Sequence, residues 1–362
     1  MTAAAAPLQR LPAWVQRAAV TVEGTVANAS LVVPTYRRGP DVVMLLDALV
    51  ALPDPPGEVV VVDGSPDDDA DERVAAWAAP RTLPFDLVVV RSEPGLTRQR
   101  NVGIDAAARD LVFYLDDDCL PLPGYFREIA AVFARDTDGR VGAVGGSIVN
   151  EMNLPLDARW RVRFMLGLVP RTLQPGQYYP TATSVPRSLT APFSGTRRVD
   201  MVPGGAVAYR RVVLLAHRFS RFFEGYSQGE DLEMSLRIGR DWTLLWSGDA
   251  HVLHNHAPGG RPASAEKGRM EVRNRYFIWK RFSPDARWSD RCRFWLDIAY
   301  IGAYDVAASL ARAGGLSSLR HAAGCARGAL ECLLDPPRHQ EPAPDREYEI
   351  QAEERRGASA DG

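Results

Sequence analysis

The chain has 362 residues, of which 46% are hydrophobic and 24% charged, and its formal net charge is −2. These values indicate an ordinary globular protein and give no electrostatic case for a nucleic-acid partner. The four cysteines form no CxxC pair, so neither a disulfide framework nor a structural zinc site is expected in so long a chain.

The sequence predicts a cytoplasmic protein. The first residues lack the pattern of a signal peptide, and no stretch approaches the ~18 uninterrupted apolar residues of a membrane span. Cysteines without disulfide partners fit a reducing compartment. The inner face of the plasma membrane is the alternative location.

Strands and helices alternate through the first part of the chain. Residues 1–29 are expected to form a loosely ordered arm or an added strand. Short β-branched runs predict strands, and apolar residues three or four positions apart predict helices. The predicted strands are 31–33, 58–62, 85–90, 111–115 and 141–149, and the predicted helices are 41–52, 71–79, 99–108 and 122–135. This alternation predicts an α/β fold in which helices cover both faces of a parallel sheet.

The second part of the chain has a different pattern. Residues 150–200 are rich in Pro, Arg and aromatic residues, and we interpret them as an excursion that determines specificity. Sheet structure is expected again at 199–209 and 242–246, and helices at 231–238, 269–282, 292–311 and 316–334. The tail from residue 335 is rich in Pro and charge, which predicts disorder.

Three adjacent carboxylates, Asp116, Asp117 and Asp118, follow the predicted strand 111–115. Like charges packed together repel and raise each other's pKa. A divalent cation removes this conflict, because Mg²⁺ and Mn²⁺ take carboxylate and phosphate oxygens as ligands. Since open α/β sheets bind ligands at the carboxyl ends of their strands, we predict a metal–diphosphate site here. A solvated acidic turn is the alternative.

Three further segments carry groups that suit a phosphorylated ligand. Pro34-Thr35-Tyr36 and Asp63-Gly64-Ser65 each follow a predicted strand, and Asp63 can accept hydrogen bonds from a uracil-type base or a ribose. Arg98 and Arg100 flank the start of a predicted helix, where arginine and backbone amides can meet phosphate. Ordinary turns and a solvated helix start are the alternatives.

Two later segments suggest catalysis. Pro203-Gly204-Gly205 provides flexible backbone close to a ligand. Asp231 begins a predicted helix, where it serves either as a helix cap or as a general base. His251, His254 and His256 lie within six residues of one another. An imidazole beside carboxylates suits Mn²⁺ better than Mg²⁺.

Several enzyme classes are excluded by missing motifs. The chain has no GxG spacing, no GKS or GKT sequence and no GxSxG sequence. It therefore lacks the fingerprints of dinucleotide-binding enzymes, kinases, P-loop NTPases and α/β-hydrolases.

Taken together, these segments resemble glycosyltransferase family 2, whose members are inverting enzymes with the GT-A fold. The matching segments are residues 32–36, 62–65, 100–104, 115–118, 203–211, 230–237 and His254. They extend from residue 31 to about residue 280, which is roughly two thirds of the chain. Each segment is common by itself, and their order and spacing make the resemblance specific.

The resemblance implies a Rossmann-like mixed, mostly parallel sheet flanked by helices, with a C-terminal helical extension. The expected parts are an arm at 1–29, a catalytic domain at 30–260, a helical extension at 261–334 and a disordered tail at 335–362. Within the catalytic domain, a nucleotide-sugar half at about 30–150 would precede an acceptor half at about 150–260.

The resemblance also implies roles for single residues. Asp231 would be the catalytic base. The expected metal ligands for Mg²⁺ or Mn²⁺ are Asp116, Asp118 and His254, with His256 as the alternative to His254. The expected nucleotide-sugar contacts are Pro34, Thr35, Tyr36, Asp63, Arg100, Asn101, Asp116, Asp117, Gly204 and Gly205.

The activity implied is transfer of a sugar from a UDP- or dTDP-sugar to a glycan or lipid-linked acceptor. Cell-envelope polysaccharide, glycolipid and secondary-metabolite glycosylation are the expected settings. No QxxRW sequence follows Asp231, which argues against a processive enzyme. The alternatives are a non-catalytic nucleotide-sugar-binding protein and a sugar nucleotidyltransferase. The second usually needs a Gly-rich loop followed by lysine, and no lysine precedes Lys267.

The helical extension at 261–334 has two interpretations. Ten basic residues lie between 261 and 295, and Trp279, Phe282, Trp288, Phe294 and Trp295 interleave with them, a composition that can lie on an anionic membrane. Alternatively, the helices pack on the catalytic domain and expose a solvated basic face, which we favour slightly.

Overall fold

The computed structural model describes residues 26–67, 69–223, 225, 227–257, 262–311 and 315–337. The main sheet consists of β1 (Val26–Thr35), β2 (Pro56–Asp63), β3 (Asp86–Arg91), β4 (Leu111–Leu115), β5 (Cys119–Pro121), β6 (Val141–Ile148), β9 (Thr196–Arg198), β10 (Ala206–Arg210) and β11 (Thr243–His254). The helices are α1 (Gly39–Val50), α2 (Asp69–Ala78), α3 (Leu96–Ala106), α4 (Tyr125–Arg135), α5 (Ala158–Met165), α6 (Arg211–Ala216), α7 (Glu230–Ile238), α8 (Ser264–Phe282), α9 (Trp288–Leu310) and α10 (Gly315–Leu334).

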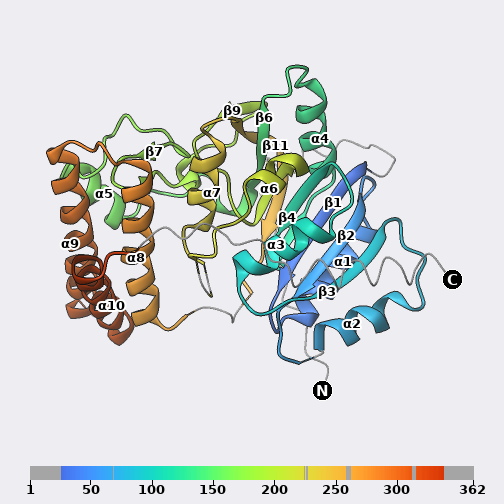
Figure 1. The fold of residues 1–362 in the computed structure, drawn as a ribbon, viewed down its shortest axis with the longest axis horizontal. Coiled ribbons are helices and arrows are strands. Elements are labelled where there is room, and N and C mark those ends of the chain that lie inside the picture. The colour runs from blue at the N-terminus through green and yellow to red at the C-terminus, as the bar shows by residue number, and fades with distance from the viewer. Residues whose placement is uncertain are drawn as a thin grey trace.

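The sheet is mixed and flanked by helices, as the family resemblance implied, whereas the alternation of strands and helices alone had indicated a parallel sheet (Figure 1). Its strands follow the order β3-β2-β1-β4-β10-β6-β11-β5, and β9 pairs with β11. The four N-terminal strands of this order are parallel. β10 runs antiparallel between β4 and β6, and β11 is parallel to β6. The carboxyl ends of β1, β2 and β4 therefore meet at one edge, where the polar segments follow them.

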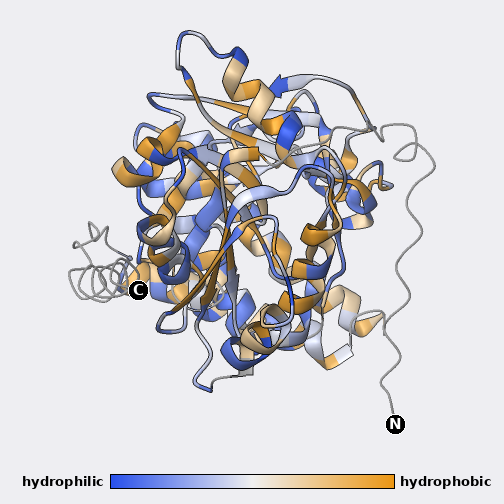
Figure 2. Cartoon of the chain, turned by 90° about the vertical axis from the view of Figure 1, so that its right-hand side faces the viewer, coloured by the Kyte–Doolittle hydropathy of each residue, from blue (hydrophilic) through white to orange (hydrophobic). Residues whose placement is uncertain are grey.

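Helices cover both faces of the sheet. Along β1, Leu31 and Val33 pack toward α1, α2 and α4, whereas Val32 packs toward α3, α6 and α7. This alternation follows from the two-residue period of a strand. Both faces are buried at the centre of the sheet, where all five residues of β4 are apolar or aromatic and buried. The helices carry hydrophobic and hydrophilic residues side by side, as Figure 2 shows.

Three features of the sheet were not predicted. β1 begins at Val26, within the predicted arm, because Val26 pairs with Pro56. β5 has three residues and pairs antiparallel with β11, which no local pattern signals. β11 extends to His254, well beyond the predicted strand 242–246. The remaining parts of the predicted arm and tail, residues 1–25 and 338–362, lie outside the described residues.

The excursion at 150–200 and the C-terminal helices pack together at one end of the molecule (Figure 1). Asp297 of α9 is fully buried and binds Arg163 of α5 at 2.8 Å and Arg275 of α8 at 2.6 Å. Arg275 also donates to Thr183 of the small β7–β8 pair (Tyr178–Tyr179 and Thr183–Ser184). The C-terminal extension and the excursion at 150–200 are therefore joined by these buried ion pairs and hydrogen bonds.

The extension also contacts helix α7 of the catalytic domain. Glu233 of α7 is fully buried, and two arginines bind its carboxylate. Arg237 comes from α7 itself, and Arg281 comes from α8 at 2.7 Å. Helix α8 therefore braces α7, the helix whose first turn carries Asp231.

Most aromatic residues of the extension are internal. Trp279 and Phe294 stack with ring centroids 4.4 Å apart and are buried, whereas Trp288 is 78% exposed. The interleaved aromatic residues thus build a core, and membrane contact stays a prediction. Among the described helices, none combines the length and the apolar character that crossing a bilayer requires.

Candidate active site

A cavity of about 780 Å³ opens at the sheet edge where β1 and β4 end. The starts of α3 and α7 and the loop before β10 form its other walls. Its lining residues are Pro34, Thr35, Tyr36, Arg38, Pro94, Gly95, Leu96, Gln99, Arg100, Asp116, Asp117, Asp118, Gly204, Gly205, Gly225, Gln228, Gly229, Glu230, Asp231 and His254. Every predicted site residue except Asp63 and Asn101 is among them.

The three adjacent carboxylates point to different partners. Asp117 accepts hydrogen bonds of 2.8 Å from Thr35 and from Arg38. Asp116 faces Arg100 at 3.5 Å, and its side chain is 40% exposed. Asp118 lies 3.5 Å from Arg38. Cations of the protein therefore relieve much of the repulsion that the sequence suggested.

The environments of Asp117 and Asp118 separate their pKa values. Burial raises the pKa of Asp117 to about 7, against the lowering effect of Arg38. Burial also opposes ionisation of Asp118. Hydrogen bonds from His254 and from the Ala257 amide outweigh that effect and lower the pKa of Asp118. Asp118 therefore ionises more readily than Asp117 at this cavity.

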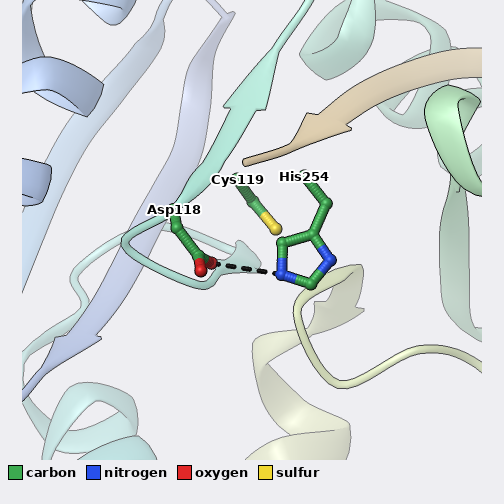
Figure 3. A group of neighbouring side chains, drawn as sticks. All are labelled: Asp118, Cys119 and His254. Carbon is green, nitrogen blue, oxygen red and sulfur yellow. Dashed lines mark ion pairs between the residues drawn. The ribbon is translucent and has the colours of Figure 1, made fainter. Parts of the chain in front are cut away.

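His254, at the end of β11, faces the carboxylate of Asp118 (Figure 3). Its Nε2 lies 3.4 Å from Asp118 Oδ1, and its Nδ1 lies 2.6 Å from Glu151 Oε1. Hydrogen bonds to Asp118 and Glu151 raise the pKa of His254 to about 10. A carboxylate behind a ring nitrogen fixes the orientation of the imidazole, as it does behind metal-bound histidines.

The neighbours of His254 have other surroundings. His256 lies 3.2 Å from Glu151 and is not among the cavity-lining residues, so the structure places His254 beside Asp118. Cys119, also drawn in Figure 3, is buried, and burial raises the pKa of its thiol well above the usual range. A protonated thiol is a poor metal ligand.

Arg100 is 1% exposed and carries its charge to the wall of the cavity. Its guanidinium binds Glu230 at 2.8 Å and faces the rings of Tyr114 and Phe219. Burial and the neighbouring Asp231 raise the pKa of Glu230 to about 8. Arg100 is therefore the cation that stabilises this buried pair of acids.

Asp231 lies in the first turn of α7 and lines the same cavity as the Asp118–His254 pair. Its Oδ1 accepts a hydrogen bond of 2.7 Å from the Leu232 amide. Burial raises the pKa of Asp231, while that hydrogen bond and the charges of Arg100 and Arg187 lower it. A carboxylate with a raised pKa is a stronger base than an exposed one.

The two glycines before β10 allow close approach of the side chains around them. A Cβ on Gly204 would lie 2.9 Å from Arg100 Nη2, and one on Gly205 would overlap the Asp116 carboxylate. Their role in this structure is to leave room for Arg100 and Asp116.

Gly205→Ala is expected to displace Asp116 and lower kcat/KM by about ten- to a hundredfold, because misplaced groups cost that much. The unfolding temperature should change little. Gly302→Ala in α9 is the matched control, since nothing lies within 4 Å of its added Cβ. Equal kinetics for Gly205→Ala and wild type would contradict a role for Asp116.

Asp63 and Asn101 do not reach the cavity. Asp63 is fully buried, and it accepts hydrogen bonds from the Ser65 amide and from Arg91. Asn101 uses both amide atoms on the backbone of Phe219, at 2.9 and 3.0 Å. In this structure both residues position neighbouring backbone. Their contact with the nucleotide-sugar stays a prediction.

Four contributors were missed by the sequence analysis. Arg38, Gln99, Glu151 and Glu230 each join segments that are distant along the chain. Gln99, for example, donates to the carbonyls of Thr35 and Val62 and so ties the ends of β1 and β2 together. Only Glu230 had a local signal, because it precedes Asp231 in the acidic pair at the start of α7.

The residues at the cavity fit a divalent cation. Asp118 and His254 offer an oxygen and a nitrogen 3.4 Å apart, and Asp116 lines the same cavity. Because the pKa of His254 is raised to about 10, its imidazole would have to release a proton before that nitrogen could bind a metal. Glu151 holds the second nitrogen of His254. A mixed set of carboxylates and one imidazole suits Mn²⁺ and is tolerated by Mg²⁺.

These features define a class of protein: an α/β fold whose strand ends gather acids, an arginine and an imidazole around one large cavity. The model of glycosyl transferase family 2 matches residues 30–213. The chain belongs to this family.

An uncharacterized glycosyltransferase of Haemophilus influenzae is 30% identical over 109 residues, which cover 30% of this chain and 35% of the relative. The match thus spans about a third of that protein. Family and relative are both named as glycosyltransferases, which gives the class of enzyme.

Two solved glycosyltransferases are among the structures to which this chain is similar. A mannosyltransferase from Pyrobaculum calidifontis, solved with GDP-Man and Mn²⁺, has a TM-score of 0.49 and 17% identity, over 90% of this chain and 94% of that chain. Glucosyl-3-phosphoglycerate synthase from Mycobacterium tuberculosis has a TM-score of 0.43 and 18% identity, over 71% and 79%. Both scores are low, so the family assignment rests on the sequence model.

Proposed function

We propose that this protein is an inverting glycosyltransferase that moves a sugar from a nucleotide-diphosphate sugar to an acceptor hydroxyl. One observation carries the proposal: Asp231 lines the same cavity as the Asp118–His254 pair. A base across from an anion-binding wall is what a single displacement at an anomeric carbon needs.

The donor would lie at the carboxyl ends of β1 and β4. Tyr36 lines the cavity, is 39% exposed and would offer its aromatic ring to the nucleotide base. Arg100, which also lines the cavity, would face the phosphates of the donor. A UDP- or dTDP-sugar is the donor that we propose. Residues 30–150 would form the donor half of the catalytic domain.

Asp231 would take the proton from the acceptor hydroxyl as its oxygen attacks the anomeric carbon. Attack from the face opposite the leaving diphosphate inverts the configuration. Arg187, whose charge faces Asp231, would help to keep that carboxylate ionised. Residues 150–260 would form the acceptor half. We propose a glycan or a lipid-linked molecule as the acceptor, to which the enzyme adds one or a few sugars.

Asp116, Asp118 and His254 would hold Mg²⁺ or Mn²⁺, with Glu151 positioning His254. When bound, such an ion neutralises charge that develops on a departing diphosphate. Settings such as cell-envelope polysaccharide, glycolipid or secondary-metabolite glycosylation follow from this activity.

A thermal-shift panel tests the donor and the metal together. UDP, dTDP, GDP and CDP are each added with Mn²⁺, Mg²⁺ or EDTA. A nucleotide at 100 times its Kd should add about 2.7 kcal/mol of stability, which raises the Tm of a chain of this size by roughly 3–4 °C. We expect a shift with UDP or dTDP that EDTA abolishes.

Asp118→Asn should remove the metal-dependent part of that shift. Asp138→Asn is the matched control, because Asp138 is exposed in a turn away from the cavity. If no nucleotide shifts the Tm of folded protein, the donor assignment is wrong. If EDTA leaves the shift intact, the metal assignment is wrong.

A further inference from the structure

A group of side chains that could hold a metal ion lies among the C-terminal helices, which pack together at one end of the molecule (Figure 1). Its members are Asp305 of α9 and His321 and Cys325 of α10. One carboxylate oxygen, one imidazole nitrogen and one sulfur lie within 4.8 Å of one another. None of the three residues lines the cavity of the candidate active site, so this group is separate from that site.

His321 is the central member of the group. Its Nδ1 lies 2.6 Å from Asp305 Oδ2 and 3.7 Å from Cys325 Sγ. His321 and Cys325 are four residues apart, so their side chains are neighbours on the same face of α10. Cys325 is 3% exposed, and the side chains of Asp305 and His321 are each 14% exposed. The three atoms therefore converge between two helices and not on the open surface.

The second nitrogen of His321 faces another carboxylate. Its Nε2 lies 3.4 Å from Glu271 Oε2 of α8, and Arg159 of α5 lies 3.5 Å from the other oxygen of Glu271. Metal-bound histidines usually direct their free nitrogen to a carboxylate, which fixes the ring and its tautomer. The ring of His321 is therefore held with Nδ1 toward Asp305 and Cys325.

Close packing of α8 on α10 fixes the helix that carries two of the three side chains. A Cβ on Gly268 of α8 would overlap the His321 carbonyl, and one on Gly324 of α10 would overlap the Ala265 carbonyl. Both glycines thus allow the backbones of the two helices to approach closely. Side chains on rigid helices hold their positions more precisely than side chains on loops, and a metal site needs that precision.

We propose that Asp305, His321 and Cys325 bind one zinc ion, with water as the fourth ligand. Sulfur and imidazole ligands favour zinc over Mg²⁺ and Ca²⁺, which prefer oxygen. Tetrahedral zinc, with bonds of about 2.3 Å to sulfur and about 2.0–2.2 Å to nitrogen and oxygen, places its ligand atoms roughly 3.3–3.6 Å apart. Nδ1 and Sγ are already close to this separation. Nδ1 and Asp305 Oδ2 would move apart by about 0.8 Å.

Zinc would replace two protons. Hydrogen bonds with Cys325 and Glu271 raise the pKa of His321 to about 10, so its imidazole carries a proton that must leave. The thiol of Cys325 must also ionise. Bonds from zinc to Nδ1, Sγ and Oδ2 form as the N–H and S–H bonds break, and both protons go to water. The exchange of two protons for one divalent cation leaves the net charge of the group unchanged.

The sequence analysis expected no structural zinc site, because the cysteines form no CxxC pair. Here a single cysteine combines with a histidine one helical turn away and with an aspartate of another helix, 16 residues before that histidine. Bound zinc would cross-link α9 to α10 and stabilise the C-terminal extension. The proposal is independent of the proposed function, because these residues do not line the cavity.

Cobalt titration tests the proposal with the reduced, metal-free full chain. Co²⁺ occupies zinc sites, and its bond to a thiolate gives an intense charge-transfer absorption band. One equivalent of Co²⁺ should produce this band in the wild type, and Zn²⁺ should then remove the band by displacing Co²⁺. Excess Mg²⁺ is present throughout, because it competes for the carboxylates of the candidate active site and not for a thiolate.

Cys325→Ser should abolish the band. Glu271→Gln should weaken Co²⁺ binding about 10–100-fold, the usual effect of losing the carboxylate behind a metal-bound histidine. Cys119→Ser is the matched control, because Cys119 is also buried beside an aspartate and a histidine. This control should keep the band and the wild-type affinity for Co²⁺. Circular dichroism checks that each variant is folded.

X-ray absorption of the zinc-loaded protein gives a second measurement that needs no change at the site. In Cys119→Ser as in the wild type, zinc should have one sulfur ligand at about 2.3 Å and lighter ligands at about 2.0–2.2 Å. A folded wild type without the charge-transfer band overturns the proposal and leaves His321 as an imidazolium between two carboxylates. A band that survives Cys325→Ser or disappears in Cys119→Ser also overturns it, as does bound zinc without a sulfur ligand.

Discussion

Asp231→Asn is expected to lower the transfer rate by at least about 10²–10⁴-fold, the usual contribution of general base catalysis. The amide keeps the shape and the acceptor oxygen of the side chain but cannot take a proton. Nucleotide binding should be nearly unchanged, because Asp231 is proposed to act on the acceptor hydroxyl and is not among the residues expected to hold the nucleotide or the metal. Release of the nucleoside diphosphate from the donor that gives a thermal shift measures the rate.

Asp241→Asn is the control, since this aspartate is exposed in the turn after α7. A wild-type rate in Asp231→Asn would show that another group is the base. Loss of nucleotide binding together with activity would instead indicate a structural role. A protein that binds nucleotide and has no activity even as wild type would support the non-catalytic alternative.

The pH profile should report the same carboxylate. The base must be ionised, and burial raises the pKa of Asp231 above its ordinary value. The rate should therefore rise with pH, along a limb displaced to higher pH than an exposed aspartate would give. This limb should disappear in the residual activity of Asp231→Asn.

Arg100→Met is expected to lower both stability and activity. Arg100 is 1% exposed and pairs with the buried Glu230, so its removal leaves an acid without its cation. Breaking a buried ion pair from one side costs about 3–5 kcal/mol. Urea denaturation measures the loss, and kcat/KM should fall because the cavity also loses the charge that faces the phosphates.

Arg98→Met on the same helix is the control. Arg98 pairs with Glu93, whose side chain is 63% exposed, and exposed pairs contribute about 0–1 kcal/mol. The double variant Arg100→Met with Glu230→Gln should recover part of the stability, because no uncompensated acid remains. An equal loss from Arg98→Met and Arg100→Met would contradict the importance of burial.

Local pattern was enough to predict the main sheet and the acids at its edge. β4 is a continuous apolar run, and Asp116 to Asp118 must follow it at the carboxyl end whatever the rest of the chain does. The parallel order of β1, β2 and β4 then brings Thr35 and these acids together. Helix α7 and its acidic first turn were visible for the same reason.

Contacts between segments that are distant along the chain could not be predicted from local sequence patterns. Arg38 meets Asp117 across 79 residues, and Glu151 meets His254 across 103 residues. Without such partners in view, charge repulsion between the acids seemed to require a metal, whereas the protein itself supplies cations. Asp63 shows the same limit, because no local pattern predicted that Ser65 and Arg91 bind its carboxylate, and its contact with a nucleotide stays a prediction.

The two arginines on Glu233 have a consequence for engineering. One comes from α7 and the other, Arg281, from α8, so a cut or exchange of the chain near residue 262 would remove half of the charge that neutralises a buried acid. Chimeras that exchange the C-terminal helices to change acceptor or assembly should therefore keep an arginine at position 281. A donor sequence with an uncharged residue there would need Glu233 replaced as well.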